Sequence, residues 1–380
     1  MKKNECLFSF GKINKYFIIP FLCPIFCFLG NYFFKLYVKM PHENSIDENI
    51  KKKLYFISST FSLTYFGGGL LYFITYIRAK TESSKKSRDF PSSSSIIYIY
   101  NDPFEQNNAL KMIFILLIIS LLINLAIIFN LLAFNKTLFE KRLYYLLILP
   151  IFSKIILKTE LFSHQILSLC ISIIGIIFLF IPTALTIEKS DIIFNILVIF
   201  ATSAYSLSYV MVKYLTHKYY LSPYFCLLFI GLFSLIIFLL GFIIYYSINN
   251  FAEFKENFIN ESLQSVLYII LSIIFFIILN VLSYLVIYFF SPTLLMVTDI
   301  INPIIKWIFS LFQDEKENKA FDIILNGIGY FLVFFSSLIY NEIIIFNFFG
   351  LNNKTKKYLE GKQKEELSII ANDNDNDIDD

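Results

Sequence analysis

The stretch SPTLLMVTDIINPIIKWIFSLFQ, residues 291–313, is apolar enough to enter a lipid bilayer, yet its middle holds polar and helix-breaking residues. They follow an i, i+3, i+4, i+7 spacing that places them on one face of a helix: Asp299, Asn302, Pro303 and Lys306. Burying one charged side chain at membrane depth costs about 2.5–3.5 kcal/mol on insertion scales, so such residues usually face a bundle interior or a cavity. We therefore predict that these four residues, the polar stripe, line a central cavity.

A second span with a similar design lies about 150 residues earlier, at 143–157, with the sequence LYYLLILPIFSKIIL. Its proline, Pro150, is followed by Ser153 and Lys154. Two spans that are interrupted by proline, each with a lysine soon afterwards, are typical of a transporter built from two related halves. Lys154 could face the cavity or extend toward the cytosol, since it stands near the end of its span.

The composition places the chain among the polytopic membrane proteins, because 57% of its residues are hydrophobic and only 16% are charged. The net charge of +3 gives no indication of a nucleic-acid partner. Cys23 and Cys27 share a helical face, but their span holds no histidine or carboxylate that could complete a metal site. We expect neither a metal nor another cofactor.

Runs of about 20 apolar residues predict transmembrane helices. There are ten in this sequence: 16–37, 54–77, 112–134, 143–157, 163–186, 191–215, 224–246, 265–290, 291–313 and 321–346. With ten spans both termini lie on the same side of the membrane. Lys and Arg are more numerous in the segments on that side, which predicts that both termini are cytosolic.

The two halves of the chain match, which predicts an all-α integral membrane protein of ten transmembrane helices arranged as two inverted five-helix repeats. Residues 16–186 form the first repeat and 191–347 the second, and an odd number of spans makes the second enter the membrane in the opposite direction. Residues 1–15 form a cytosolic N-terminus. Disorder is predicted for the loop 79–110 and for the cytosolic tail 352–380, which are rich in polar residues.

Residues that match between the two halves identify the candidate site. Asn124, Pro150 and Lys154 in the first half correspond to Asn280, Pro303 and Lys306 in the second, and Gly175 corresponds to Gly329. The candidate substrate-binding residues are Lys306, Asp299, Lys154, Asn302, Asn280 and Asn124, with Pro150 and Pro303 as helix breaks. Asn124 and Asn280 could instead hydrogen-bond neighbouring helices.

Three stretches carry a resemblance to a known family. They are LPIFSKIILKTELFSHQILSLCISIIGIIFLFIP (149–182), YFFSPTLLMVTDIINPIIKWIFSLF (288–312) and the stretch 201–224, which ends in LSPY. The first resembles the end of a repeat in the drug/metabolite transporter superfamily, of the EamA-like kind, through Pro150, Glu160, Gln165 and Gly175. This resemblance implies a carrier like the eukaryotic nucleotide-sugar transporters of the Golgi and endoplasmic reticulum. It also implies that Lys154 and Lys306 contact phosphate groups.

The predicted function is therefore secondary transport of a small, anionic, nucleotide-sugar-like metabolite across an endomembrane by alternating access. The partners are that small molecule and the bilayer, with no nucleic acid, and a homodimer remains open. A membrane-embedded enzyme such as a lipid-headgroup transferase is an alternative, but its chemistry needs clustered acids or histidines. The three histidines lie far apart in the sequence, so we expect no catalytic residue. A non-transporting receptor or scaffold is the third possibility, although a scaffold needs no buried charge.

Overall fold

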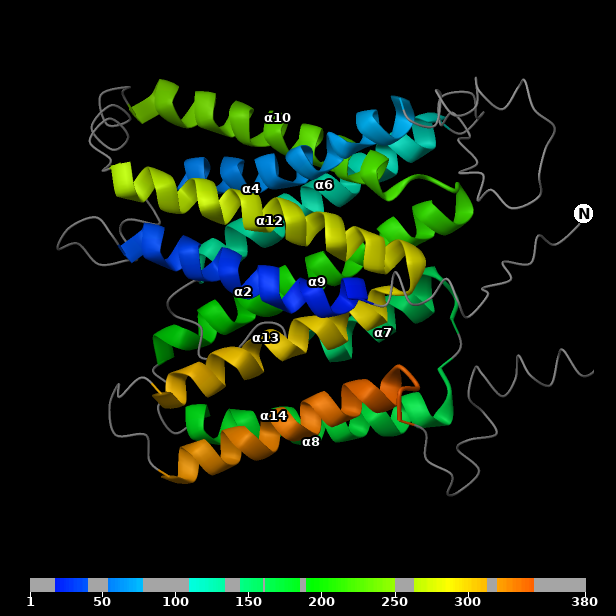
Figure 1. Ribbon diagram of the computed structural model, residues 1–380, viewed down its shortest axis with the longest axis vertical. Helices are drawn as coiled ribbons and strands as arrows, with labels where there is room; N and C mark the ends of the chain where they lie inside the picture. The colour runs from blue at the N-terminus through cyan, green and yellow to red at the C-terminus, as the bar shows by residue number, and fades with distance from the viewer. Residues whose placement is uncertain are drawn as a thin grey trace, which may run out of the picture. The chain divides into compact units, whose positions relative to one another are not determined.

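The computed structural model describes residues 18–39, 54–77, 109–133, 144–159, 161–184, 189–249, 263–312 and 320–344. This part of the chain is almost entirely helical and contains no strand (Figure 1). The helices are α2 (Ile18–Lys39), α4 (Leu54–Gly69), α6 (Ala109–Leu132), α7 (Tyr145–Ile156), α8 (Ser163–Ala184), α9 (Lys189–Lys218), α10 (Pro223–Asn249), α12 (Leu263–Phe289), α13 (Pro292–Phe312) and α14 (Ala320–Tyr340).

Residues 71–77 are helical as well, after a turn at Leu70 that follows α4. The last two residues of the loop predicted at 79–110 belong to α6, because that helix begins at Ala109. The rest of that loop, the N-terminus 1–15 and the tail 352–380 lie outside the described residues.

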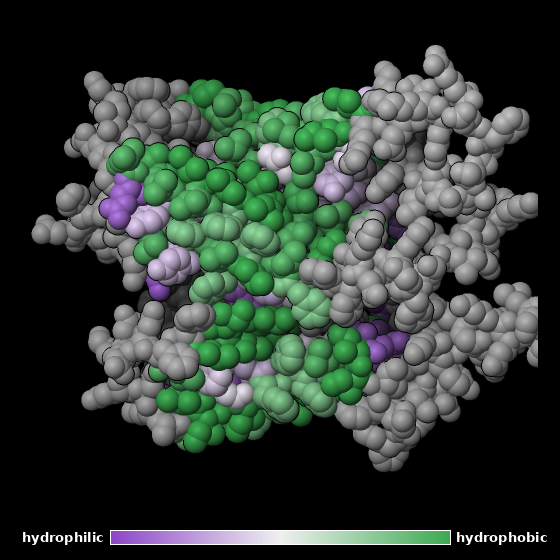
Figure 2. Space-filling model, viewed as in Figure 1, coloured by the Kyte–Doolittle hydropathy of each residue, from purple (hydrophilic) through white to green (hydrophobic). Residues whose placement is uncertain are grey.

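Seven of these helices are long and apolar enough to cross a membrane: α2, α6, α8, α9, α10, α12 and α14. The chain is thus a multi-pass integral membrane protein of the all-α class. Of the other three helices, α4 and α7 are shorter, with 16 and 12 residues. The number of ten spans therefore stays a prediction. Figure 2 shows the outward surface of the described helices to be mostly apolar, as a lipid-facing surface must be.

The helices form two compact units. The first contains α2, α4, α6, α7, α9, α10, α12 and α13, and the second contains α8 and α14. Both predicted repeats contribute to both units, because α8 is the fifth span of the first repeat and α14 the fifth span of the second.

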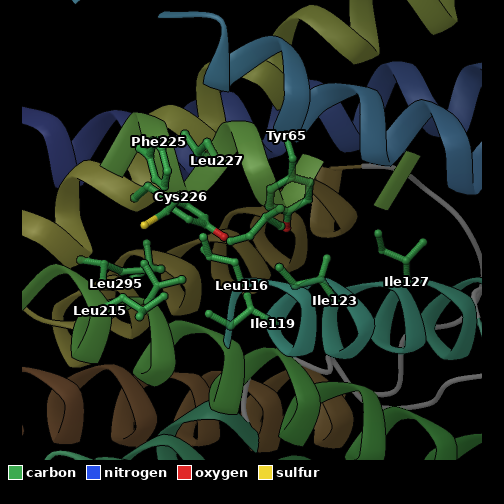
Figure 3. Packing of buried hydrophobic residues seen from close by; sticks show 14 of the residues in the cluster. Tyr65, Leu116, Ile119, Ile123, Ile127, Leu215, Phe225, Cys226, Leu227 and Leu295 are labelled. Atoms are coloured by element: carbon green, nitrogen blue, oxygen red, sulfur yellow. The ribbon is translucent and has the colours of Figure 1, made fainter. Parts of the chain in front are cut away.

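Side chains from distant parts of the sequence fill the interior of the first unit. Leu116, Ile119 and Ile123 of α6 are fully buried against residues of α9 and α10 such as Leu215 and Leu227 (Figure 3). Lipid tails are as apolar as these side chains, so close van der Waals packing rather than the hydrophobic effect holds such helices together.

Glycines bring α4 and α10 into backbone contact, which Figure 1 shows as two adjacent helices. A Cβ atom on Gly231 of α10 would lie 2.2 Å from the backbone nitrogen of Phe66. A Cβ atom on Gly69 of α4 would lie 2.3 Å from the Cα of Leu228. The two helices therefore use a glycine each to approach the other, as small residues do in membrane bundles.

In the second unit, glycines likewise let two helices approach each other closely. A Cβ on Gly175 of α8 would lie 3.0 Å from the carbonyl oxygen of Gly329, and a Cβ on Gly329 of α14 would lie 2.9 Å from that of Gly175. The Ser168 hydroxyl donates a 2.6 Å hydrogen bond to the carbonyl oxygen of Ser336. The two glycines that the sequence comparison matched thus meet at the crossing point of these helices.

Gly231→Ala should destabilise the protein by about 1–3 kcal/mol, because the added methyl group meets backbone atoms that cannot rotate away. The measurement is thermal unfolding in detergent, followed by fluorescence-detected size-exclusion chromatography. Gly30→Ala is the matched control, since the three atoms nearest to its Cβ would be side-chain atoms in the ring of Phe276, the closest at 3.1 Å. An equal loss in both variants would contradict the backbone contact between α4 and α10.

Candidate functional site

The start of α13, the helix that carries the polar stripe, is fixed by local sequence. The hydroxyl of Ser291 accepts a 3.1 Å hydrogen bond from the backbone N–H of Leu294, which makes Ser291 the N-cap. Pro292 occupies the first helical position, where its missing N–H leaves no donor unsatisfied. The helix therefore begins at a defined residue after only a two-residue connection from α12.

A lysine that sequence reasoning passed over holds the end of α12. The ammonium of Lys213, on α9, donates hydrogen bonds of 3.0 and 3.1 Å to the carbonyl oxygens of Tyr288 and Phe290. A cation at a helix C-terminus also stabilises the negative end of the helix dipole. Lys213 thereby anchors the α12–α13 connection to α9. Its sequence signal was weak, because a lysine near a span end is usually solvated.

Four helices of the first unit surround α13: α2, α7, α9 and α12. Asn302 and Pro303 are buried, whereas Asp299 and Lys306 are half-buried. The polar stripe therefore lies on the side of α13 that faces the bundle for at least its central part. Pro303 also leaves the carbonyl oxygen of Asp299, four residues earlier, without its usual helical donor.

Two of the three predicted site asparagines are buried with no hydrogen-bond partner among the described residues. Asn302 is 0% and Asn124 is 3% exposed, and this holds for both amide atoms of each side chain. Burying an unpaired amide costs about 1–3 kcal/mol. Asn280 differs, because its amide donates a 2.8 Å hydrogen bond to the hydroxyl of Thr64. Asn280 therefore ties α12 to α4, which was the alternative reading of its role.

Asp299 is half-buried on a helix that packs against α2 and α9. Lys306 is seven residues further along the same helix, about 10 Å along its axis. The carboxylate and the ammonium thus mark the two ends of the stripe.

The fourth predicted span, α7, lies against α13. Its proline, Pro150, and the neighbouring Ser153 are buried, but the side chain of Lys154 is exposed within the first unit. The structure therefore brings the two proline-bearing helices together and does not enclose Lys154 between them. Among the residues that the structure describes, no group of three or more histidines, cysteines or carboxylates could hold a metal ion.

Asn302→Leu should raise the thermal stability of the ligand-free protein by about 1–2 kcal/mol, because leucine has a similar shape and leaves no unpaired amide. Asn280→Leu is the matched comparison and should lower stability by about 0.5–1.5 kcal/mol, since Thr64 loses a hydrogen bond. Unfolding curves of both variants in the same detergent give the measurement. A loss of stability in Asn302→Leu as large as that in Asn280→Leu would show that Asn302 has a partner in the folded protein.

No model of a known protein family matches the chain, and no curated protein is significantly similar to it. The assignment of a function therefore depends on the site itself and on how its helices pack.

Proposed function

We propose that the protein is a secondary transporter that moves a small anionic metabolite across an endomembrane by alternating access. Its membrane would be that of the Golgi or endoplasmic reticulum, with both termini in the cytosol. The resemblance of residues 149–182, 201–224 and 288–312 to the drug/metabolite transporter superfamily supports a nucleotide-sugar-like cargo. The observation that carries the proposal is a symmetry in the helix contacts.

Most of the helix contacts are retained when each helix is exchanged for its counterpart in the other predicted repeat. The contacts α12–α13, α9–α12 and α9–α13 are the exceptions, because their counterparts are weak or absent among the described helices. The counterparts are α2 and α9, α4 and α10, α6 and α12, α7 and α13, and α8 and α14. Thus the α2–α12 contact corresponds to α9–α6, α4–α12 to α10–α6, and α7–α9 to α13–α2. Three contacts join a helix to its own counterpart: α4–α10, α7–α13 and α8–α14.

Such an exchange symmetry is expected of two repeats related by a two-fold axis. Five spans in each repeat would make their membrane orientations opposite, and the proposed substrate site then lies where the repeats meet. The contact between α7 and its own counterpart, α13, joins the two proline-bearing helices. This contact supports a site on the polar stripe, near the two prolines. Both helices continue through Pro150 and Pro303, so the breaks predicted at these residues are not seen in the structure.

Within this site, Lys306 would contact an anionic group of the substrate, and the amide of Asn302 would supply a hydrogen bond. Asp299 would position Lys306 between transport events. Lys154 would act at the entrance rather than in the centre, because its side chain is exposed. A charge-assisted contact in a desolvated site contributes about 1.5–3 kcal/mol, which corresponds to roughly ten- to a hundredfold in affinity.

Lys306→Ala should abolish uptake in proteoliposomes that are screened with nucleotide sugars, amino acids and small phosphorylated metabolites. The protein should remain inserted and folded, as judged by its size-exclusion profile. Lys306→Arg should recover only part of the uptake, since a planar guanidinium does not replace a compact ammonium. Uptake by Lys306→Ala at the wild-type rate would place the anion site elsewhere.

The proposed topology is tested separately. Tags at the N- and C-termini should both be removed by protease that is added outside sealed microsomes, because the charge distribution favours cytosolic termini. Protection of either tag would contradict an even number of spans with cytosolic ends.

A further inference from the structure

A buried histidine in the second unit contacts a carboxylate, and neither belongs to the polar stripe. His164 lies in the first turn of α8, and its side chain is only 5% exposed. Its Nε2 atom is 3.2 Å from Oε1 of Glu342, which follows the end of α14 and has a side chain that is 17% exposed. The ring of Phe162 stacks on the imidazole, with 5.9 Å between centroids and 9° between planes. Protein therefore encloses the imidazole, and water can reach the pair through the carboxylate.

The carboxylate is held in place by a turn with an unusual backbone conformation. Glu342 has a φ of 58°, in the left-handed region that glycine adopts far more readily than glutamate. The backbone N–H groups of Ile343 and Ile344 close this turn by donating hydrogen bonds of 3.0 and 3.3 Å to the carbonyl oxygen of Leu338. Because the same turn carries the carboxylate, a movement of Glu342 away from His164 would disrupt these hydrogen bonds.

Neither helix packing nor a metal ion accounts for a titratable pair at this position. Gly175 and Gly329 already bring α8 and α14 together, and Ser168 is bonded to a carbonyl oxygen of α14. Zinc sites use at least three protein ligands. Among the described residues, no group of three or more histidines, cysteines or carboxylates could supply them. The ligand that suits one imidazole beside one carboxylate is a proton.

We propose that His164 and Glu342 form a proton-binding site whose occupancy sets the conformation at this end of α14. A proton from water forms a bond to an imidazole nitrogen, and the carboxylate supplies the counter-charge. The imidazolium then carries an N–H group on both nitrogens. In the described conformation Nδ1 of His164 is buried with no hydrogen-bond partner among the described residues, so the neutral ring fits this conformation better. Proton binding therefore favours a second conformation, in which Nδ1 has an acceptor or meets water.

The electrostatic surroundings of the imidazole are simple. Within the described part of the second unit, Glu342 is the one charged group that acts on His164. The other titratable side chains described in this unit are Lys158, Cys170, Asp322, Tyr330 and Tyr340. Glu160 lies outside the described residues. The proton affinity of His164 should therefore depend on Glu342 more than on any of these groups.

The direction of the pH effect follows from the burial of Nδ1. The described conformation favours the neutral ring, so it loses stability relative to the second conformation as pH falls through the range in which His164 binds its proton. In a transporter, such an equilibrium couples substrate movement to a pH difference across the membrane. This coupling deepens the proposed function and rests on it, whereas the proton site is testable without substrate.

Solid-state NMR of the full chain in lipid bilayers, with isotope-labelled histidine, reads the protonation of each imidazole between about pH 5 and pH 8. The chain has three histidines, so His42→Gln and His217→Gln assign the signal of His164 by elimination. We expect His164 to gain one proton within this range. In Glu342→Gln its proton affinity should fall about tenfold or more, because the counter-charge is lost while the shape is kept.

Hydrogen–deuterium exchange of the backbone amides of residues 338–344 reports the conformational change. Lowering the pH from about 8 to about 5 should raise exchange there about fivefold or more in the wild type relative to His164→Gln. Comparison of the two proteins at the same pH removes the intrinsic pH dependence of exchange. His217→Gln is the matched control and should behave like the wild type, since the side chain of His217 is exposed.

Two results would overturn the proton site: an imidazole of His164 that keeps one protonation state over the whole range, or an unchanged proton affinity in Glu342→Gln. Equal pH dependence of exchange in the wild type and in His164→Gln would overturn the link to the turn. The wild-type titration stays decisive where a substitution at either residue prevents folding. The uptake test on Lys306 decides the proposed function separately, so either idea can fail alone.

Discussion

A buried amide between a half-buried carboxylate and a half-buried ammonium on one helix is the constraint on which the rest of this structure depends. Lipid offers no hydrogen bonds, and each charged group exposed at membrane depth would cost about 2.5–3.5 kcal/mol. Helix α13 therefore needs protein around it, which α2, α7, α9 and α12 supply. The Ser291 cap and the Lys213 anchor set where α13 begins, and so which of its residues face inward. The position of Asp299 and Asn302 thus follows from contacts outside the stripe.

Close packing elsewhere makes this enclosure possible. Gly69 and Gly231 let α4 and α10 meet at the backbone, and both helices in turn contact α6 and α12. The hydroxyls of Ser120 on α6 and Ser234 on α10 share a 3.0 Å hydrogen bond. Asn280 makes the corresponding bond between α12 and α4. Hydrogen bonds between side chains thereby reinforce the equivalent pairs α6–α10 and α4–α12.

Sequence periodicity predicted the helices well, because apolar runs and capping residues are local signals. It also placed Asp299, Asn302 and Lys306 on one face, since spacing along one helix decides that. Contacts between helices could not be predicted in the same way. Tyr145 and Tyr209 stack across 64 positions of the chain, and nothing in the sequence near either residue indicates the other. Lys154 shows the same limit, because spacing placed it beside Pro150 but could not say that its side chain is exposed.

The unpaired amide of Asn302 links the stability of the bundle to its proposed activity. In this conformation the side chain is fully enclosed, so neither water nor a substrate reaches it. Its desolvation raises the free energy of the enclosed state by about 1–3 kcal/mol. A conformation that opens the surroundings of α13 would let a ligand satisfy the amide and recover that energy. An asparagine at this position therefore lowers the free-energy cost of opening, whereas an apolar residue would favour the closed bundle. The proposed alternating access needs the open and closed states to lie close in free energy.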